Sequence, residues 1–253
     1  MNHIHSSTKE YDAIIVGAGF SGLYQLICLR DQLGLKCVVL ETGDDVGGTW
    51  YWNRYPGARC DTESHAYSYY FSDELLKEWT WSERYPGHEE IREYMNFVAS
   101  KFDLKKDILF KQKVTSAKFI EDSNNWNVKT DNNNFKCKFL ITAVGCLSNT
   151  NIPKIKGLDN FEGSYYHTGN WPKNGVSFVN KTVGQIGTGS TGIQAVPVIA
   201  AEAKHLTVFQ RTANYSIPAR NKPLTAKFKK QVKENFQYYR DLIKRTPNAH
   251  PFE

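Results

Sequence analysis

Several features that would place this chain in other classes of protein are missing from the sequence. No stretch approaches the roughly 20 consecutive apolar residues that a transmembrane helix needs. The polar opening MNHIHSSTKE has no apolar signal-peptide core. The five cysteines are odd in number and include no C-x-x-C pair, so neither a disulfide framework nor a metal site is indicated. We therefore predict a cytoplasmic protein with reduced thiols, no bound metal and no membrane span.

Acidic residues are outnumbered, but the basic surplus is local. The formal net charge is +6, and between Leu224 and Arg245 seven basic and two acidic residues contribute 7 − 2 = +5. A basic helix face of this kind is typical of solvated surface rather than of a phosphate track. No nucleic-acid partner is expected. The apolar residues of this segment recur at helical spacing: Leu224, Phe228, Val232, Phe236, Tyr239 and Ile243.

The N-terminal 41 residues read as a β-α-β unit. Tyr11–Gly17 and Leu35–Glu41 are apolar runs typical of strands covered on both faces, and Phe20–Leu33 has helical spacing. A right-handed crossover makes such strands parallel neighbours. The first strand ends in the turn Gly17-Ala18-Gly19-Phe20-Ser21-Gly22, whose glycines allow a pyrophosphate to approach the backbone. Glu41, 41 − 17 = 24 residues on, is placed to bind a ribose diol.

A second unit of the same kind begins 187 − 17 = 170 residues later. Lys181–Gly187 and His205–Gln210 predict strands, with a helix near Thr191–Ala203 between them. The glycine turn is Gly187-Thr188-Gly189-Ser190-Thr191-Gly192, and Arg211 follows its first glycine by 211 − 187 = 24 residues. A guanidinium binds a 2′-phosphate, which a carboxylate would repel. The sequence therefore predicts FAD or NAD at the first turn and NADP at the second.

The intervening sequence completes the expected architecture. Gly43–Tyr70 reads as an ordered loop and Glu89–Phe102 as an amphipathic helix, and Lys113–Val144 predicts a small antiparallel ribbon leading into a buried strand, Phe139–Val144. We expect an α/β fold with two Rossmann-like, three-layer FAD/NAD(P)-binding domains, both incomplete in this chain. The expected division is an FAD-binding domain at 1–150, the first β-α-β unit of an NADPH-binding domain at 151–222, and the start of a helical insertion at 223–253.

Two dinucleotide turns in one chain imply two cofactors. FAD with NADPH is the usual pairing, because a hydride passes from the nicotinamide to the flavin. The turns alone predict an NADPH-dependent flavoprotein and no more specific class.

The segment Phe161-Glu-Gly163-Ser-Tyr-Tyr-His167-Thr-Gly-Asn-Trp171-Pro172 is more specific. It matches every fixed position of F-x-G-x-x-x-H-x-x-x-W-P/D, the fingerprint of the type I Baeyer–Villiger monooxygenases, a branch of the flavin-containing monooxygenase superfamily. Gly47–Asp61 resembles the flavin-side loop of that family, and Phe209–Thr212 is similar to its NADPH strand end. The resemblance extends from about Tyr11 to Arg245.

The resemblance implies a reaction and a set of residues. NADPH reduces the flavin, O₂ adds to give a C4a-peroxyflavin, and the peroxide converts a small ketone into an ester or lactone. Asp61 is implied as the active-site carboxylate, and His167 and Trp171 as hinge and domain-contact residues. FAD is implied to lie among Gly48, Thr49, Trp50, Asp61, Tyr67 and Val114. Further cofactor-binding candidates are Arg59, Gln194 and Thr212.

The sequence also departs from the family. His65-Ala66 replaces what is usually an apolar-acidic pair. The arginine that stabilises the peroxyflavin, most of the helical substrate domain and the segment that completes the FAD sheet lie in later sequence, so we expect an N-terminal fragment, inactive in isolation, with uncovered apolar surface. Two alternatives stay open: a flavin-dependent N- or S-monooxygenase, and a truncated nucleotide-binding remnant without activity.

Overall fold

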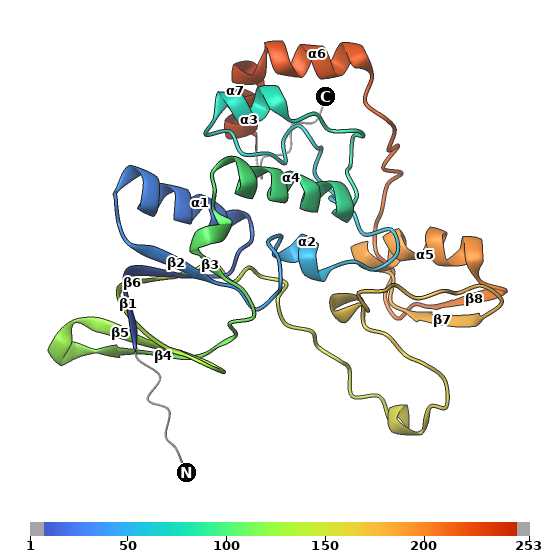
Figure 1. Ribbon diagram of the computed structural model, residues 1–253. Coiled ribbons are helices and arrows are strands. Elements are labelled where there is room, and N and C mark those ends of the chain that lie inside the picture. Colours follow the sequence, from blue (N-terminus) through green and yellow to red (C-terminus); the bar gives the residue numbers. More distant parts are fainter. Residues whose placement is uncertain (1–7, 247–253) are drawn as a thin grey trace. The chain divides into compact units, whose positions relative to one another are not determined.

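The computed structural model describes residues 8–246, which form two compact units (Figure 1). The first unit contains the chain up to Trp52 together with Arg92–Asp159, and the second contains Asn53–Ile91 and the chain from Asn160 onward. In the described part of the chain, no helix combines the length and apolar character that crossing a membrane requires.

The first unit is built on a six-stranded sheet with the order β3-β2-β1-β6-β5-β4. Four neighbouring strands are parallel, and β5 and β4 continue the sheet as an antiparallel ribbon beside β6. The strands are β1 (Lys9–Val16), β2 (Cys37–Leu40), β3 (Ile108–Leu109), β4 (Val114–Ile120), β5 (Asn125–Thr130) and β6 (Asn134–Thr142). The predicted β-α-β unit and ribbon are therefore confirmed.

The sheet of the first unit is covered on two sides. Helix α1 (Phe20–Ile27) lies over one face of β1 and β2 (Figure 1). A core cluster joins Ile14, Val38 and Leu40 of these strands to Val128 of β5 and Phe135 of β6. Both faces of β1 and β2 are thus buried, as their continuous apolar runs predicted.

Helix α4 (His88–Lys101) follows the predicted amphipathic pattern. Ile91, Tyr94, Met95 and Val98 are all buried. The helix expected to reach Leu33 instead ends in a π-helical turn at Cys28–Gln32. Other short helical segments are α2 (Thr49–Trp52) and 3₁₀ turns at Lys105–Asp107, Glu121–Ser123, Leu158–Asn160 and Thr168–Asn170.

The expectation of a buried strand at Phe139–Val144 was wrong in two respects. The strand is the longer β6, which ends at Thr142 and pairs with both β1 and β5. Its second half is not fully buried, since Phe139 is 49% exposed, and Val144, which follows the strand, is 53% exposed. Phe139 pairs with Ala13 of β1, but the pairing with β5 ends at Cys137, so the described part of the chain provides no second neighbouring strand at Phe139.

The second unit contains a parallel pair, β7 (Thr182–Ile186) and β8 (His205–Phe209), joined by α5 (Ser190–Glu202). Figure 1 shows α5 lying over one face of this pair. Trp171, Phe178, Ala195 and Ile199 form its core with Tyr55 and Ala58. The expected second β-α-β unit is confirmed.

The division into units differs from the expected boundary at residue 150. Asn53–Ile91 lies in the second unit because Tyr55 and Ala58 pack against α5 rather than against the first sheet. Short-range sequence patterns contain no information on this long-range packing. The assignment of FAD-binding and NADPH-binding domains stays a prediction.

The C-terminal helical segment is two helices, α6 (Ala226–Glu234) and α7 (Phe236–Arg245), rather than one continuous face. Asn235 separates them: it leaves the helical conformation, and its side-chain amide donates to the carbonyl of Gln231 at 2.9 Å. An Asn side chain commonly ends a helix by competing for backbone partners in this way.

Packing within the second unit explains the departure at His65. The imidazole of His65 is 7% exposed and lies edge-on to the rings of Phe228 and Tyr239, at 5.5 and 5.1 Å between centroids. It therefore attaches α6 and α7 to the loop that precedes α3 (Asp73–Glu78).

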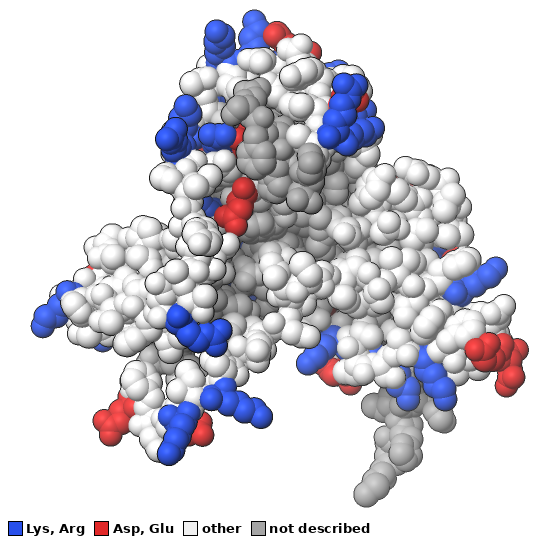
Figure 2. Space-filling view, turned by 180° about the vertical axis from the view of Figure 1, so that it is seen from behind, with Lys and Arg blue, Asp and Glu red and all other residues white. Residues whose placement is uncertain are grey.

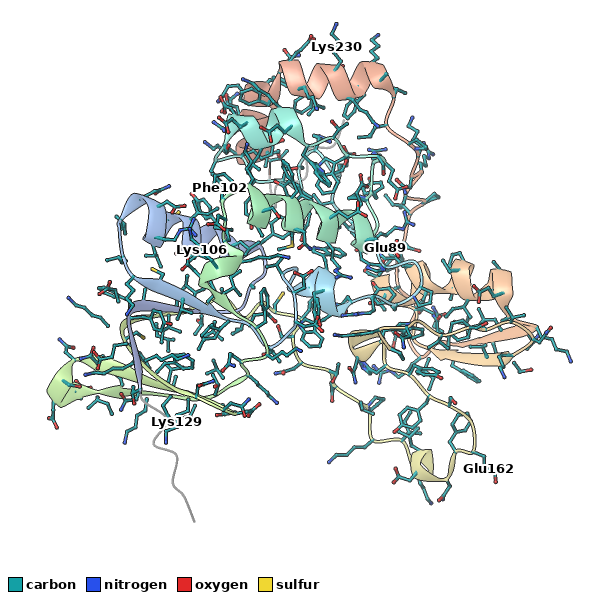
Figure 3. All side chains as sticks on the ribbon, viewed as in Figure 1. Glu89, Phe102, Lys106, Lys129, Glu162 and Lys230 are labelled. Carbon is teal, nitrogen blue, oxygen red and sulfur yellow. The ribbon has the colours of Figure 1, made fainter. Side chains whose placement is uncertain are left out.

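Several basic residues of α6 and α7 have acidic or carbonyl partners. Lys230 projects outward from α6 (Figure 3) and lies 3.7 Å from Glu234. Lys233 donates to the carbonyl of Lys77 at 2.7 Å, and Arg240 lies 3.7 Å from Asp73. At the top of Figure 2, blue basic side chains predominate and a smaller red acidic group lies among them. Such a surface fits the solvated face that the sequence predicted.

Candidate cofactor-binding sites

The first glycine turn lies between β1 and α1, and Glu41 contacts it directly. The carboxylate of Glu41 is 5% exposed and accepts the N–H groups of Ala18 and Gly43, each at 2.7 Å. Each carboxylate oxygen can accept a further hydrogen bond. Glu41 therefore closes the end of β2 onto the turn, and its predicted role in binding ribose hydroxyls stays a prediction.

The flavin-side loop packs against the same turn, backbone on backbone. Gly47 N–H donates to the carbonyl of Ala18 at 3.1 Å. A Cβ added at Gly48, where φ is +53°, would lie 2.7 Å from Gly19 Cα. Only glycine permits both this φ and this approach. Thr49 and Trp50 begin α2 directly after this contact.

Charged side chains hold this loop in place within the first unit. Asp45 accepts from Lys105 Nζ at 2.8 Å and from Asn96 Nδ2 at 3.2 Å. Burial opposes ionisation of Asp45, but these hydrogen bonds and that from Val46 N–H outweigh it and lower the pKa of the carboxyl. Tyr51 donates to Asp44 at 2.6 Å, and the guanidinium of Arg92 lies over the Tyr51 ring. The loop is thus preorganised beside the turn.

The second glycine turn forms an open pocket of about 850 Å³ with the end of β8. Arg211 lies in the pocket wall, as its sequence offset predicted. Helix α5 begins after Gly189 with no side-chain cap, so its first N–H groups are available to an anion. A Cβ added at Gly189 would meet no protein atom within 4 Å. The pocket is lined by Ile186, Gly187, Thr188, Gly189, Val208, Phe209, Gln210, Arg211, Thr212 and Asn214.

Asp61, the candidate catalytic residue, lies in the second unit and is bound to Gln194 of α5. Gln194 Nε2 donates to Asp61 Oδ1 at 2.7 Å, and Gln194 Oε1 accepts from Tyr55 OH at 2.8 Å. Gln194 also bonds the backbone of Arg59 in both directions. Burial and, to a smaller extent, the Asp61 carboxylate raise the pKa of Tyr55, so it remains a proton donor to Gln194 at neutral pH.

Glycine is required where this loop approaches α5. Gly57 has φ +78°, and a Cβ there would collide with the carbonyl oxygen of Gln194. Arg59, a predicted cofactor contact, is engaged by Tyr85 O at 3.3 Å and by Glu83 at 3.6 Å. The second unit therefore brings Asp61, Arg59 and Gln194 together through tight contact with the helix that follows the second glycine turn.

The fingerprint segment is anchored at one end. Trp171 is 8% exposed and belongs to the core around α5, whereas Phe161 is 58% exposed. Glu162 lies on the loop at the lower right of Figure 3. His167 Nδ1 accepts the N–H of Gly169 at 3.1 Å and caps the 3₁₀ turn Thr168–Asn170. This geometry fits a structural role for His167 rather than proton transfer.

The predicted residues are divided between the units. Gly17 to Gly22, Glu41, Gly48 to Trp50 and Val114 belong to the first unit, whereas Arg59, Asp61, Tyr67 and every residue of the second turn belong to the second. Val114 packs at the margin of the core below β1 and β2. Sequence reasoning missed Tyr55, Gln210 and Asn214. Gln210 was adjacent to the predicted Arg211, but Tyr55 and Asn214 stand in no recognisable spacing.

Two glycine turns, each placed between a parallel strand and a helix, define a protein with two dinucleotide sites. Residues 11–227 match the FMO-like family, described as flavin-binding monooxygenase-like, and the chain belongs to this family. The family resemblance read from the fingerprint is thereby confirmed.

Individual relatives within this family show which enzymes the chain is similar to. A Baeyer-Villiger monooxygenase of Pseudooceanicola batsensis is 46% identical over 96% of this chain and 45% of its own length. Cyclohexanone 1,2-monooxygenase of an Acinetobacter species is 47% identical over 91% of this chain and 42% of its own length. The crystal structure of cyclohexanone monooxygenase from Rhodococcus sp. Phi1 bound to NADP+ superimposes with a TM-score of 0.94 at 44% identity, covering 98% of this chain and 46% of that one. The chain spans a little under half the length of these relatives.

Proposed function

We propose that this chain provides the FAD and NADPH sites of a monooxygenase that inserts one oxygen atom of O₂ into small ketones. The observation that carries the proposal is the opposite charge at two equivalent positions. Glu41 closes the first glycine turn, and Arg211 lines the pocket at the second. Five free cysteines support a cytoplasmic location.

The first turn fits FAD. The diphosphate would lie at the N-terminus of α1, where the first N–H groups lack intrahelical acceptors, and Glu41 would accept the adenosine ribose hydroxyls. Gly47 and Gly48 keep the flavin-side loop close to this turn without a side chain in the way. When bound, the flavin supplies the redox chemistry that these residues cannot.

The second turn fits NADPH. Arg211 would bind the 2′-phosphate, and the N–H groups at the start of α5 would bind the diphosphate. We propose that Asp61, oriented by Gln194 and Tyr55, is the active-site carboxylate and fixes polar groups of the nicotinamide end. Asp61 is exposed in the second unit and so is accessible to a ligand.

Titration of the purified chain with NADP+ and NAD+ tests the second site directly. NADP+ should bind more tightly, and Arg211→Ala should remove most of the difference. Equal affinities for the two nucleotides in the wild-type chain would contradict the assignment.

A chimaera tests the reaction. This chain would replace the corresponding half of a cyclohexanone monooxygenase, and products would be analysed after incubation with NADPH, O₂ and cyclohexanone. The ester product, dependent on Asp61, is expected. If the chimaera forms N-oxides or sulfoxides from amine and sulfide substrates but no ester, the N- or S-monooxygenase alternative is favoured. If it binds nucleotides but oxygenates no substrate, the alternative of a nucleotide-binding remnant without activity is favoured.

A further inference from the structure

Two side-chain amides hold the second glycine turn at one residue, Thr188. Gln210 Nε2 donates to Thr188 Oγ1 at 2.9 Å, and Asn214 Nδ2 donates to the carbonyl of Thr188 at 3.2 Å. Both amides come from the chain that follows β8, and both line the pocket with the turn. We call these two hydrogen bonds the Thr188 tether.

The first turn is held at the equivalent residue. Ala18, like Thr188, stands between the first and second glycines. Its N–H donates to Glu41, and its carbonyl accepts the N–H of Gly47 at 3.1 Å. In both units the first glycine also donates to the last residue of the neighbouring strand, Gly17 to Leu40 and Gly187 to Phe209, each at 2.9 Å. Each turn is thus fixed at the same carbonyl by chain beyond the second strand.

The side chains that hold the two glycine turns differ in charge. The first turn uses a carboxylate, which suits an unphosphorylated ribose. At the second turn a carboxylate would lie beside Arg211 and repel a 2′-phosphate. Neutral amides hold Thr188 without adding negative charge, and they leave Arg211 free to bind a phosphate.

We propose that Gln210 and Asn214 are positioning residues for the diphosphate of the nicotinamide cofactor. This inference rests on the proposed function, in which NADPH binds at the second turn. The tether fixes a Gly-Thr-Gly sequence that would otherwise sample many conformations, so that its N–H groups and those at the start of α5 already face the diphosphate. Preorganisation of this kind raises affinity by removing an ordering cost from the binding step.

The test compares three nucleotides on the 253-residue chain by calorimetric titration. NADP+ contains both the diphosphate and the 2′-phosphate, NAD+ only the diphosphate, and adenosine 2′-monophosphate only the 2′-phosphate. Gln210→Met with Asn214→Leu removes the tether with side chains of similar size. We expect NADP+ and NAD+ to bind about tenfold more weakly, and adenosine 2′-monophosphate to bind as in the wild type. Arg211→Ala should instead weaken NADP+ and adenosine 2′-monophosphate and leave NAD+ unchanged.

The exposed side-chain amide of Gln237, which forms hydrogen bonds with Asp241 and Arg240, provides a matched control. Gln237→Met should change none of the three affinities. If the double variant unfolds at a lower temperature, the two single variants are titrated instead, and each should weaken NAD+ about threefold. Unchanged NAD+ and NADP+ binding, or an equal loss for adenosine 2′-monophosphate, would overturn the inference. A failure of Arg211→Ala to discriminate would instead refute the NADPH assignment.

Discussion

The substitution Gly189→Ala tests whether glycine at this position is needed for folding or for nucleotide binding. Gly189 has φ −71°, which any residue adopts, and its added Cβ would have no protein atom within 4 Å. Neither backbone strain nor a steric clash within the protein therefore requires glycine at this position. The remaining reason is the ligand, because Gly189 lines the pocket at the start of α5.

The magnitudes follow from this geometry. Removing a glycine without strain reduces the entropy of the unfolded chain and raises the free energy of unfolding by about 0.4–1 kcal/mol. Alanine is less favourable than glycine at a helix N-cap, the position that Gly189 holds in α5, and this cost offsets the gain, so the Tm of Gly189→Ala should stay within about 3 °C of that of the wild type. The methyl group would displace the diphosphate from the helix N–H groups. Loss of one charge-assisted hydrogen bond costs about 2 kcal/mol, so NADP+ should bind about thirtyfold more weakly.

Gly192→Ala is the matched control within the same motif. Its Cβ would lie 2.6 Å from the carbonyl oxygen of Gly187, so the turn and α5 must separate. Overpacking of this kind costs about 1–3 kcal/mol, and the Tm should fall. Differential scanning calorimetry and nucleotide titration on the same samples measure both effects. If Gly189→Ala binds NADP+ like the wild type, the diphosphate does not lie at this turn.

Three further predictions concern single side chains. Arg211→Ala should weaken NADP+ by about 2 kcal/mol, roughly thirtyfold, and leave NAD+ unchanged in titrations; equal losses would show that Arg211 does not bind the 2′-phosphate. Glu41→Gln should lower the free energy of unfolding in urea by about 1–3 kcal/mol, since an amide cannot accept from both Ala18 and Gly43 and leaves a buried N–H unpaired; wild-type stability would contradict this. Burial raises the pKa of Cys60 to about 11, so at pH 8 only about 0.1% is thiolate, and maleimide should label the exposed Cys146 and spare Cys60. The stability contributed by the protonated Cys60 thiol is present below its ordinary pKa of 9.0 and should be lost as pH rises through 11.

The sequence predicted the parts of the fold that depend on short-range order. A strand, a G-x-G-x-x-G turn and a helix form one continuous segment, so the positions of Gly17 and Gly187 could be read directly. The offset of 24 residues also placed Glu41 and Arg211 correctly, because strand and helix lengths fix where the second strand ends. Sequence patterns of this kind specify the turn and its nearest charged residue together.

The parts that could not be predicted depend on contacts between distant segments. Gly57 is required by a helix 137 residues away, as 194 − 57 = 137, and Asn214 reaches back 214 − 188 = 26 residues to Thr188. Neither contact has a local period or motif. The assignment of Asn53–Ile91 to the second unit has the same cause, since Tyr55 and Ala58 look like ordinary loop residues until α5 is placed beside them.

The two-stranded sheet of the second unit leads to a final prediction. Val183 and Leu206 are paired across β7 and β8 and pack toward the core, whereas the pair Ile186 and Phe209 lies on the opposite face, 72% and 56% exposed. Parallel sheets are ordinarily buried on both faces, so this face should bind apolar partners. We expect the 253-residue chain to bind 8-anilinonaphthalene-1-sulfonate and to self-associate as its concentration rises.

Two substitutions on the same sheet test whether this face is responsible. Ile186→Lys should reduce dye binding and association while the Tm stays within about 2 °C of the wild type, because the side chain is already in water. Leu206→Lys removes a partly buried side chain that packs against the core and places a charge there, so it should lower the Tm by more than Ile186→Lys does. Dye binding that is unaffected by Ile186→Lys would locate the apolar surface elsewhere, and equal stability of the two variants would show that the sheet has no covered face.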